Sequence, residues 1–332
     1  MNTSPSLDPS GRTRQREIGP VIIDTDPGID DLVALALAAR SPFLDIVAVT
    51  TTYGNASLEA TTRNARELLR LADRTDVPVH PGSDRPLVRP LVTAPETHGA
   101  TGVGHAPIRT TTPAGVTRNE HVMTELLTDC SQPITLLTLG PLTNLAHALE
   151  DDRQLVRARI SQHIGMFGCL TQRGSAKRWA DFNAWCDPEA ADRVVRAGIH
   201  TRMVALDVTR LMILRPDEVR AFTASLDPLV KWLGEALRYY VTVHRNRDGL
   251  KGCYVHDALA IGELLCPGLM TFATHGLRVD LDDGAHRGHT RVSLRGDPLH
   301  IAVDVDVALM RRLLDPVFGE RWHTQQGAGE NK

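Results

Sequence analysis

The sequence has few aromatic residues, few cysteines and no strong excess of either charge. Phenylalanine, tryptophan and tyrosine make up 4% of the 332 residues, which argues against an aromatic platform for single-stranded nucleic acid. The five cysteines include no C-x-x-C pair, which argues against a disulfide framework or a cysteine zinc site. The net charge of −3 predicts no basic surface for nucleic acid or for an acidic membrane.

Long apolar runs are also missing. No run is long enough to cross a bilayer, and residues 1–18 lack the apolar stretch of a secretory signal. Together with the scattered cysteines, these absences predict a cytoplasmic protein without a membrane partner. We expect residues 1–18 to be a disordered leader, residues 19–322 a single domain, and residues 323–332 a disordered tail.

Strand-like apolar runs alternate with helix-like segments along the first two thirds of the chain. The expected strands are 21–24, 45–51, 77–80, 134–139, 163–167 and 201–206. The expected helices are 30–39, 58–72, 121–128, 142–149 and 188–197. This rhythm predicts an α/β fold with an open, mostly parallel sheet and helices on both faces. In such sheets the site lies beyond the carboxyl ends of the strands.

The last third of the chain has a different character. Two segments read as helices, 216–240 and 256–265, and two as strands, 290–294 and 299–305. We expect these segments to form a small C-terminal extension at the edge of the sheet. Residues 81–113 form a long loop rich in proline and glycine, and loops of this length are typically lids or disordered.

Four carboxylates follow the first apolar run within eight residues: Asp24, Asp26, Asp30 and Asp31. Like charges this close repel, and raised pKa values or a bound cation relieve the repulsion. A hard divalent cation with oxygen ligands is the natural partner. The plainer interpretation is that Asp30 and Asp31 complement a helix dipole while the other two form a turn.

The carboxylate cluster is the first of six motifs that occur in one order along residues 20–310. They are DTDPGIDD (24–31), TTYGN (51–55), HGATGVG (98–104), LGPLTNLA (139–146), DFNAWCDPEAA (181–191) and VHD (255–257). In these motifs the chain resembles the nucleoside hydrolase family of the inosine–uridine-preferring type. The resemblance implies an open α/β fold, a Ca²⁺ ion at the bottom of the pocket, and a homo-oligomer, either dimer or tetramer.

The resemblance also implies roles for individual residues. The metal ligands would be Asp26, Asp31, Asp257 and the backbone carbonyl of Leu139. Ribose hydroxyls would be held by Asp30, Asn55 and Asn183. Asp26 would activate a metal-bound water as general base, and His256, which titrates near neutrality, would assist the leaving base. The implied reaction splits a ribonucleoside into ribose and a free base.

The chain departs from the family pattern where relatives bind the ribose 5′-hydroxyl. Relatives have Glu and Asn where this chain has the shorter Asp181 and Ser175, so we expect a roomier or water-bridged 5′ end. Arg173, Lys177 and Arg178 lie in the same loop. They form either a solvated basic loop or a site for a charged 5′ substituent such as phosphate.

The base side of the pocket is less defined by the sequence. His98 in the third motif, together with His244 and Arg247, is expected to contact substrate, although a basic helix C-terminus also explains the last two. Tyr239, Tyr240 and Tyr254 are interpreted as packing residues. The preferred base stays open.

Two other functions are considered. Asp24-Thr25-Asp26 resembles the nucleophile motif of haloacid-dehalogenase-type phosphatases, but Gly28 stands where that motif needs Thr or Val. The second is a non-catalytic or altered-specificity member that binds nucleosides or calcium, or acts on 5′-modified ribosides. The changes at Asp181 and Ser175 are its basis.

Overall fold

A nine-stranded sheet forms the centre of the protein, in a computed structural model that describes residues 18–110, 116–171, 174–175, 179–320 and 322. Its strand order is β10-β9-β11-β6-β5-β4-β1-β2-β3. The bounds are β1 Val21–Thr25, β2 Ile46–Thr51, β3 Val79–Pro81, β4 Ile134–Thr138, β5 Ile160–Met166, β6 Thr201–Val204, β9 Met270–Val279, β10 Thr290–Val292 and β11 Asp297–Val305. Neighbours from β3 to β11 run parallel, whereas β9 and β10 run antiparallel. The expected mostly parallel sheet is thus confirmed, with an antiparallel edge as its C-terminal extension.

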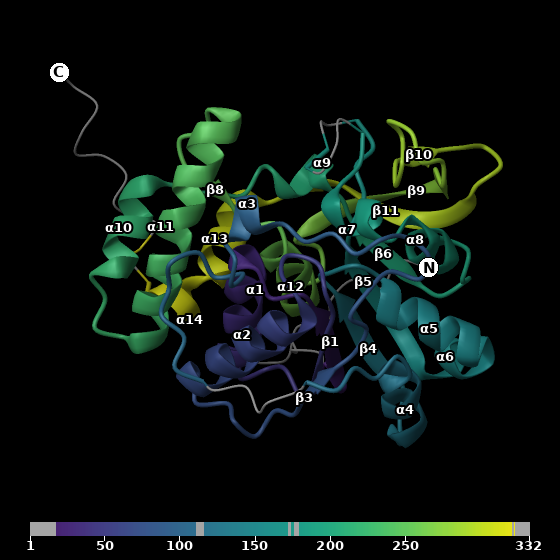
Figure 1. The fold of residues 1–332 in the computed structure, drawn as a ribbon, viewed down its shortest axis with the longest axis horizontal. Coiled ribbons are helices and arrows are strands. Elements are labelled where there is room, and N and C mark those ends of the chain that lie inside the picture. The colour runs from purple at the N-terminus through teal and green to yellow at the C-terminus, as the bar shows by residue number, and fades with distance from the viewer. Residues whose placement is uncertain (1–17, 111–115, 172–173, 176–178, 321, 323–332) are drawn as a thin grey trace, which may run out of the picture.

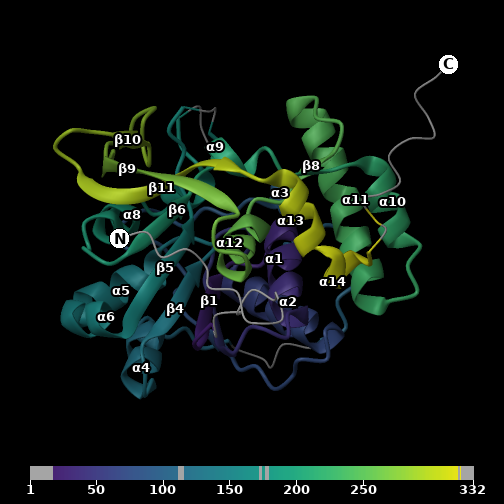
Figure 2. The ribbon, with the colours of Figure 1, turned by 180° about the vertical axis from the view of Figure 1, so that it is seen from behind.

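Helices cover both faces of the sheet, as the strand–helix rhythm predicts. Their bounds are α1 Ile29–Arg40, α2 Leu58–Leu71, α3 Pro95–His98, α4 Val122–Asp129, α5 Thr143–Asp151, α6 Arg153–Arg159, α7 Phe182–Cys186, α8 Pro188–Val195, α9 Leu206–Thr209, α10 Pro216–Thr223, α11 Pro228–Asp248, α12 Ala258–Leu265, α13 Val307–Leu313 and α14 Asp315–Phe318. A two-stranded sheet pairs β7 (Ile213–Leu214) with β8 (Cys253–Tyr254). Figures 1 and 2 show α10 and α11 at the opposite end of the molecule from β9 and β10.

The central strand β1 contributes to two separate hydrophobic cores. Val21 and Ile23 pack into the core formed with α1, α2, α11 and α12, whereas Ile22 packs into the core formed with α4, α5 and α8. Successive side chains of a strand point to opposite faces, so a continuous apolar run serves two layers of helices. This double burial fixes the carboxyl end of β1, where the acidic motif begins.

Three expectations about the last third of the chain are corrected by the structure. The single helix expected at 216–240 is two helices, because Asp227 accepts hydrogen bonds from the amides of residues 229 and 230 and starts α11. Helix α11 continues to Asp248 and ends at Gly249, whose φ of 67° favours glycine. Strand β9 was not expected, and it separates β10 from β11 in the sheet.

The loop expected at 81–113 contains the short helix α3, which lies against α11. The expected leader, except for residue 18, and the whole expected tail lie outside the described residues, so the domain bounds stay a prediction. In the part of the chain that the structure describes, no helix is both long and apolar enough to cross a membrane.

Candidate active site

Buried carboxylates gather where β1 ends and α1 begins. Asp30 and Asp31 lie in the first turn of α1, and Asp257 is the residue before α12, which packs against α1. Carboxylate oxygens of these three residues all lie within 4.8 Å of one another. Residues far apart in the sequence therefore form one acidic centre, as the family resemblance implied.

Hydrogen bonds hold Asp31 in place at this centre. Its Oδ1 accepts from the Thr25 hydroxyl at 2.6 Å, and its Oδ2 accepts from the Gly28 amide at 3.1 Å and from Asn55 Nδ2 at 2.8 Å. A Cβ atom at Gly28 would lie 2.6 Å from Asn55 Nδ2 and from His98 Nδ1. Only glycine therefore fits where the loops after β1 and β2 meet.

Asp26 lies beside this centre in a tight backbone cradle. Its Oδ2 accepts from the Asn55 amide at 2.7 Å, while its buried Oδ1 meets no hydrogen-bond donor among the described residues. A Cβ at Gly54 or Gly140 would approach the Asp26 carboxylate to 2.0 or 2.5 Å. A buried carboxylate oxygen without a donor is costly, and this one is placed to receive a cation or a proton.

Burial raises the pKa of the carboxyls at this centre above their ordinary range. For Asp26 the main cause is desolvation, followed by the negative charge of Asp31, and its pKa lies well above 3.8. Desolvation followed by the charge of Asp31 also raises the pKa of Asp257, and that of Asp30 to about 7. A divalent cation would remove this repulsion and keep the carboxylates ionised.

Asp24, the fourth carboxylate of the motif, also has one buried oxygen without a donor among the described residues, Oδ2, but its other oxygen is held by side chains of β2 and α5. Its Oδ1 accepts from the Thr50 hydroxyl at 2.6 Å and from Asn144 Nδ2 at 2.7 Å. Desolvation raises its pKa to about 6. Asp24 does not line the cavity described below, and its contacts tie β1 to β2 and α5.

A cavity of about 330 Å³ opens above the acidic centre, which is within the range of small-molecule pockets. Most of the residues expected at the site from the sequence line it. They are Asp30, Asn55, His98, Leu139, Ser175, Asp181, Asn183, His244, Arg247, His256 and Asp257. Asp26 and Asp31 lie behind this lining, buried from solvent.

The backbone carbonyl of Leu139, an expected metal ligand, lies at the end of β4. It accepts a hydrogen bond of 2.7 Å from Asn183 Nδ2, which also donates to the Met166 carbonyl at 2.9 Å. Both amide hydrogens of Asn183 are thus bound to carbonyls at the ends of β4 and β5. A carbonyl oxygen has two lone pairs, so the Asn183 contact leaves Leu139 able to accept a second partner.

Asp181 and Ser175, expected near the 5′ end of the sugar, are both bound to backbone amides. Asp181 caps α7 and accepts from the amides of Gly168, Asn183 and Ala184 at 2.6 to 3.2 Å. Ser175 Oγ accepts from the Phe182 amide at 2.9 Å. These two side chains therefore shape α7 as well as lining the cavity. The basic residues 173, 177 and 178 lie outside the described residues.

Rings form a continuous wall on the other side of the cavity. Centroid distances are 5.2 Å for His98–Tyr240, 4.3 Å for Tyr240–His244, and 5.2 Å for Tyr254–His256. Burial lowers the pKa of His98 to about 3 and that of His244 to about 4. These imidazoles are therefore neutral at pH 7 and act through ring N–H groups and lone pairs.

His256 differs from the expectation that it titrates near neutrality. Desolvation, followed by the influence of His244, lowers its pKa well below 6.5. Its Nδ1 is 2.8 Å from the Thr209 hydroxyl. For His98 the tautomer follows from geometry, because its Nδ1 accepts from the Ile29 amide at 3.1 Å and the proton must then be on Nε2.

Tyr240, which the sequence analysis interprets as a packing residue, belongs to the site. It lines the cavity, and its hydroxyl hydrogen-bonds to Asp30. The helical spacing carried the signal, since Tyr240, His244 and Arg247 stand at i, i+4 and i+7 on α11 and share one face. Tyr239 points elsewhere and packs against Gly104 and His105. Trp185 and Phe182 of α7 also line the cavity without having been expected.

Comparison with known proteins decides between the functions that such a site could have. The family described as inosine-uridine preferring nucleoside hydrolase matches residues 21–312. The pyrimidine-specific ribonucleoside hydrolase RihA of Photobacterium profundum is 38% identical over 297 residues, covering 87% of this chain and 94% of that protein. The chain belongs to the nucleoside hydrolase family. The enzyme class implied by the motifs, an N-glycosyl hydrolase, is thus confirmed.

Other relatives support the same family. RihA of Escherichia coli K12 is 35% identical over 294 residues, covering 87% of this chain and 94% of that protein. A plant nucleoside hydrolase structure matches with a TM-score of 0.82 and 31% identity, covering 90% of this chain and 98% of that one. A purine-preferring ribonucleoside hydrolase from Gardnerella vaginalis matches with a TM-score of 0.83 and 27% identity over the same shares. Family membership argues against the phosphatase alternative and does not favour a binding-only protein.

Proposed function

We propose that this nucleoside hydrolase is a Ca²⁺-dependent enzyme that hydrolyses the N-glycosidic bond of ribonucleosides to ribose and a free base. The observation that carries the proposal is the cavity above buried carboxylates, with Asp26 Oδ1 lacking a donor. The oxocarbenium-like transition state of this reaction is positive, and carboxylates such as Asp30 would stabilise its charge.

The donor set suits a hard cation. Asp26, Asp31, Asp257 and the Leu139 carbonyl would hold it, since they offer only oxygen atoms and an excess of negative charge. When bound, the ion would supply positive charge that attracts the oxygen atoms of the sugar hydroxyls and lowers the pKa of a bound water molecule. Asp30, Asn55 and Asn183 would then face the ribose from the cavity lining.

Proton transfers are assigned to residues on both sides of the cavity. Asp26 would accept the proton of the attacking water at its unpaired Oδ1, as general base. The departing base gains negative charge and needs a hydrogen-bond or proton donor. His256 would assist it, and His98, as the neutral tautomer protonated on Nε2, adds a second N–H group to the same cavity. His244 and Arg247 complete the base side.

The two RihA relatives are named pyrimidine-specific, which supports pyrimidine ribonucleosides as the preferred substrates. The 5′ alternative keeps one specific support, because the oxygens of Asp181 and Ser175 already accept backbone amides and offer less to a 5′-hydroxyl. Cytoplasmic location, dimeric or tetrameric assembly and the absence of nucleic-acid partners stay predictions.

Ribose release from uridine, cytidine, inosine, adenosine and guanosine, with and without a calcium chelator, tests the proposal. We expect chelator-sensitive release that falls by at least about 100-fold in Asp26→Asn, the lower range for loss of a general base. Asp24→Asn is the matched control, because Asp24 lies two residues away and its Oδ1 is held by Thr50 and Asn144, outside the proposed ligand set. Release that persists in Asp26→Asn, or that ignores the chelator, contradicts the assignment.

A further inference from the structure

The turn between β9 and β10 brings together side chains that the proposed reaction does not use. Asp280 directly follows β9, and His289 directly precedes β10. The Asp280 amide donates to the His289 carbonyl at 3.0 Å, and the Gly288 amide donates to the Asp280 carbonyl at 2.8 Å. These two bonds close the neck of the turn and set Asp280 and His289 opposite each other.

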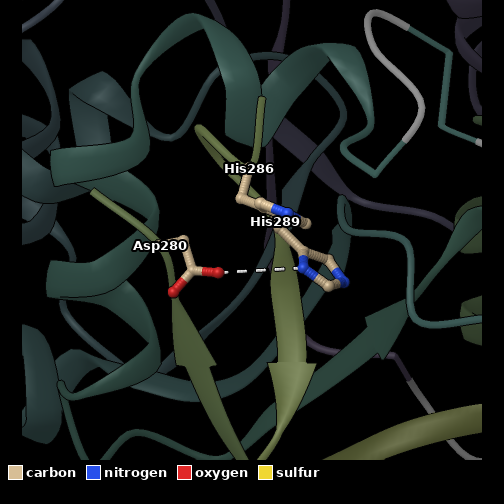
Figure 3. A group of neighbouring side chains, drawn as sticks. All are labelled: Asp280, His286 and His289. Carbon is tan, nitrogen blue, oxygen red and sulfur yellow. Dashed lines mark ion pairs between the residues drawn. The ribbon is translucent and has the colours of Figure 1, made fainter. Parts of the chain in front are cut away.

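Three potential metal ligands converge at this neck. Asp280 Oδ2 lies 3.8 Å from His289 Nδ1, and ligand atoms of Asp280, His286 and His289 all lie within 4.8 Å of one another. Figure 3 shows the carboxylate directed at the His289 ring, with His286 close beside that ring. The two imidazole centroids are 5.8 Å apart. Small side-chain rotations would bring all three groups onto one ion.

Neighbouring side chains orient Asp280 and His289 toward each other and partly enclose them. Arg291 Nη2 lies 2.9 Å from Asp280 Oδ1, so it orients the carboxylate and leaves Oδ2 facing His289. Partial burial lowers the pKa of His289 despite the opposing effect of Asp280, which favours the neutral imidazole. Trp179 covers the two histidines, with ring centroids 5.6 Å from His286 and 5.9 Å from His289.

The turn is anchored independently of any ion. Gly288 lies so close to α7 that a Cβ there would be 2.6 Å from the Ala184 carbonyl, and its φ is 71°. The Arg287 guanidinium lies 4.5 Å from the centre of the Trp185 ring and donates to the Cys186 carbonyl at 3.2 Å. Pre-positioned ligands lose less entropy on binding, so this anchoring favours affinity.

We propose that Asp280, His286 and His289 form a second metal site, which takes Zn²⁺ or a similar divalent transition metal. Two imidazoles and one carboxylate are the ligand types of three-ligand zinc sites, in which water completes a tetrahedron. Imidazole nitrogen distinguishes this site from the all-oxygen acidic centre, which suits Ca²⁺. The site lies on the outer side of α7, the helix that carries Asn183 and Trp185 of the cavity.

The first test is a calorimetric titration of the full-length protein with Zn²⁺ in excess Ca²⁺, which keeps the acidic centre occupied. We expect one Zn²⁺ per chain and at least about 10-fold weaker binding in His286→Asn and in Asp280→Asn, since even outer-shell partners contribute that much. His275→Asn is the matched control, because His275 is an exposed histidine on β9 outside the cluster. Unchanged binding in His286→Asn, or no Zn²⁺ binding by the wild type, overturns the proposal.

A spectroscopic test locates the ion without relying on a loss of affinity. Cu²⁺ quenches nearby indole fluorescence, and the Trp179 ring covers both histidines. We expect saturable quenching in the wild type and His275→Asn, and a much smaller effect in Trp179→Phe and His286→Asn. Because His286 is exposed, its replacement leaves folding intact, which circular dichroism verifies. Equal quenching in all four proteins contradicts the site.

Discussion

At the scale of single residues, the site depends on donors that keep the buried carboxylates in position. Asp30 lines the cavity and accepts a hydrogen bond from the hydroxyl of Tyr240, a residue that is 3% exposed. A hydrogen bond to a charged group contributes about 1.5–3 kcal/mol. Tyr240 therefore helps to orient the Asp30 carboxylate in the cavity.

Tyr240→Phe keeps the ring and removes only this donor. We expect kcat/KM for ribonucleosides to fall by about 10- to 100-fold, the kinetic equivalent of that bond energy, and the free energy of unfolding to fall by at most about 1.5–3 kcal/mol. Steady-state kinetics on the best base of the panel measure the effect. Tyr239→Phe is the control, since Tyr239 packs against His105 and does not line the cavity. Equal losses in both variants would show that Tyr240 acts only through packing.

Sequence patterns located the acidic residues well because charge is conspicuous in an apolar context. Asp26, Asp30 and Asp31 stood out in this way, Asp257 was expected from the family resemblance, and the structure brings all four to one centre. Sequence patterns failed at Tyr240, because a tyrosine side chain can both pack in a core and form a hydrogen bond at a site. Tyr240 is apolar enough to read as core, and although it shares a helix face with His244 and Arg247, its hydroxyl contact with Asp30 depends on the fold. The neutral state of His256 depends on burial, which the sequence does not display.

At the scale of elements, α7 is a short helix that carries Asn183 into the cavity. Its position depends on Asp181, whose carboxylate accepts three backbone amides from β5's outgoing loop and from α7 itself. Loss of an N-cap costs about 0.5–2 kcal/mol in stability. Here it would also release the helix that positions Asn183, which we propose as a ribose contact.

Asp181→Ala is therefore expected to lower both stability and activity. We expect a loss of about 1–2 kcal/mol in the free energy of unfolding and a reduced kcat/KM. The matched control is Asp152→Ala, because Asp152 caps α6 through the amides of residues 154 and 155 and does not line the cavity. It should lose similar stability and keep full activity. Denaturant unfolding measures the stability of both variants, and ribose release measures their activity. Unaltered activity in Asp181→Ala would show that the position of α7 does not affect catalysis.

Elements were predictable where burial is complete and unpredictable at the edge of the sheet. All residues of β1 and β4 are buried, and their apolar runs identified them. Strand β9, with sequence MTFATHGLRV, is buried mainly at its two ends, so neither an apolar run nor clean alternation marks it. The division between α10 and α11 depended on the Asp227 cap inside a segment that is helical on both sides.

At the scale of the whole molecule, we expect stability to depend on pH through a buried histidine that is not part of the acidic centre. His163 of β5 lies between the hydroxyls of Thr138 and Thr201, and burial lowers its pKa from 6.5 to about 3. Below pH 6.5 the unfolded chain binds a proton at His163, whereas the folded protein keeps this side chain neutral until the pH approaches 3. The contribution of His163 to the free energy of unfolding is therefore complete above pH 6.5 and is lost as the pH falls toward 3.

His163→Gln should flatten this dependence. Each proton taken up on unfolding changes stability by at most about 1.4 kcal/mol per pH unit, so the wild type should lose stability faster than the variant between pH 6 and 4. Denaturant unfolding at several pH values measures both slopes. Replacement of the exposed His275 by Gln should leave the wild-type slope. Parallel slopes for wild type and His163→Gln would mean that other groups cause the acid sensitivity.

A cation at the acidic centre would also stabilise the entire fold, since the ligands that we propose come from distant parts of the chain. Asp26 and Asp31 flank the start of α1, Leu139 follows β4, and Asp257 precedes α12. An ion that binds only the folded state adds RT ln(1 + [L]/Kd), or about 2.7 kcal/mol at 100 times Kd.

Thermal unfolding of chelator-treated protein, with and without added Ca²⁺, measures this stabilisation. We expect Tm to rise with Ca²⁺ concentration in the wild type and in Asp24→Asn, whose carboxylate has its own donors in Thr50 and Asn144. Asp26→Asn removes one ligand and one repelling charge, so it should be more stable than the wild type without Ca²⁺ and gain less when Ca²⁺ is added. A Ca²⁺-induced rise of equal size in Asp26→Asn would place the ion away from Asp26, while leaving the hydrolase assignment to the ribose-release measurement.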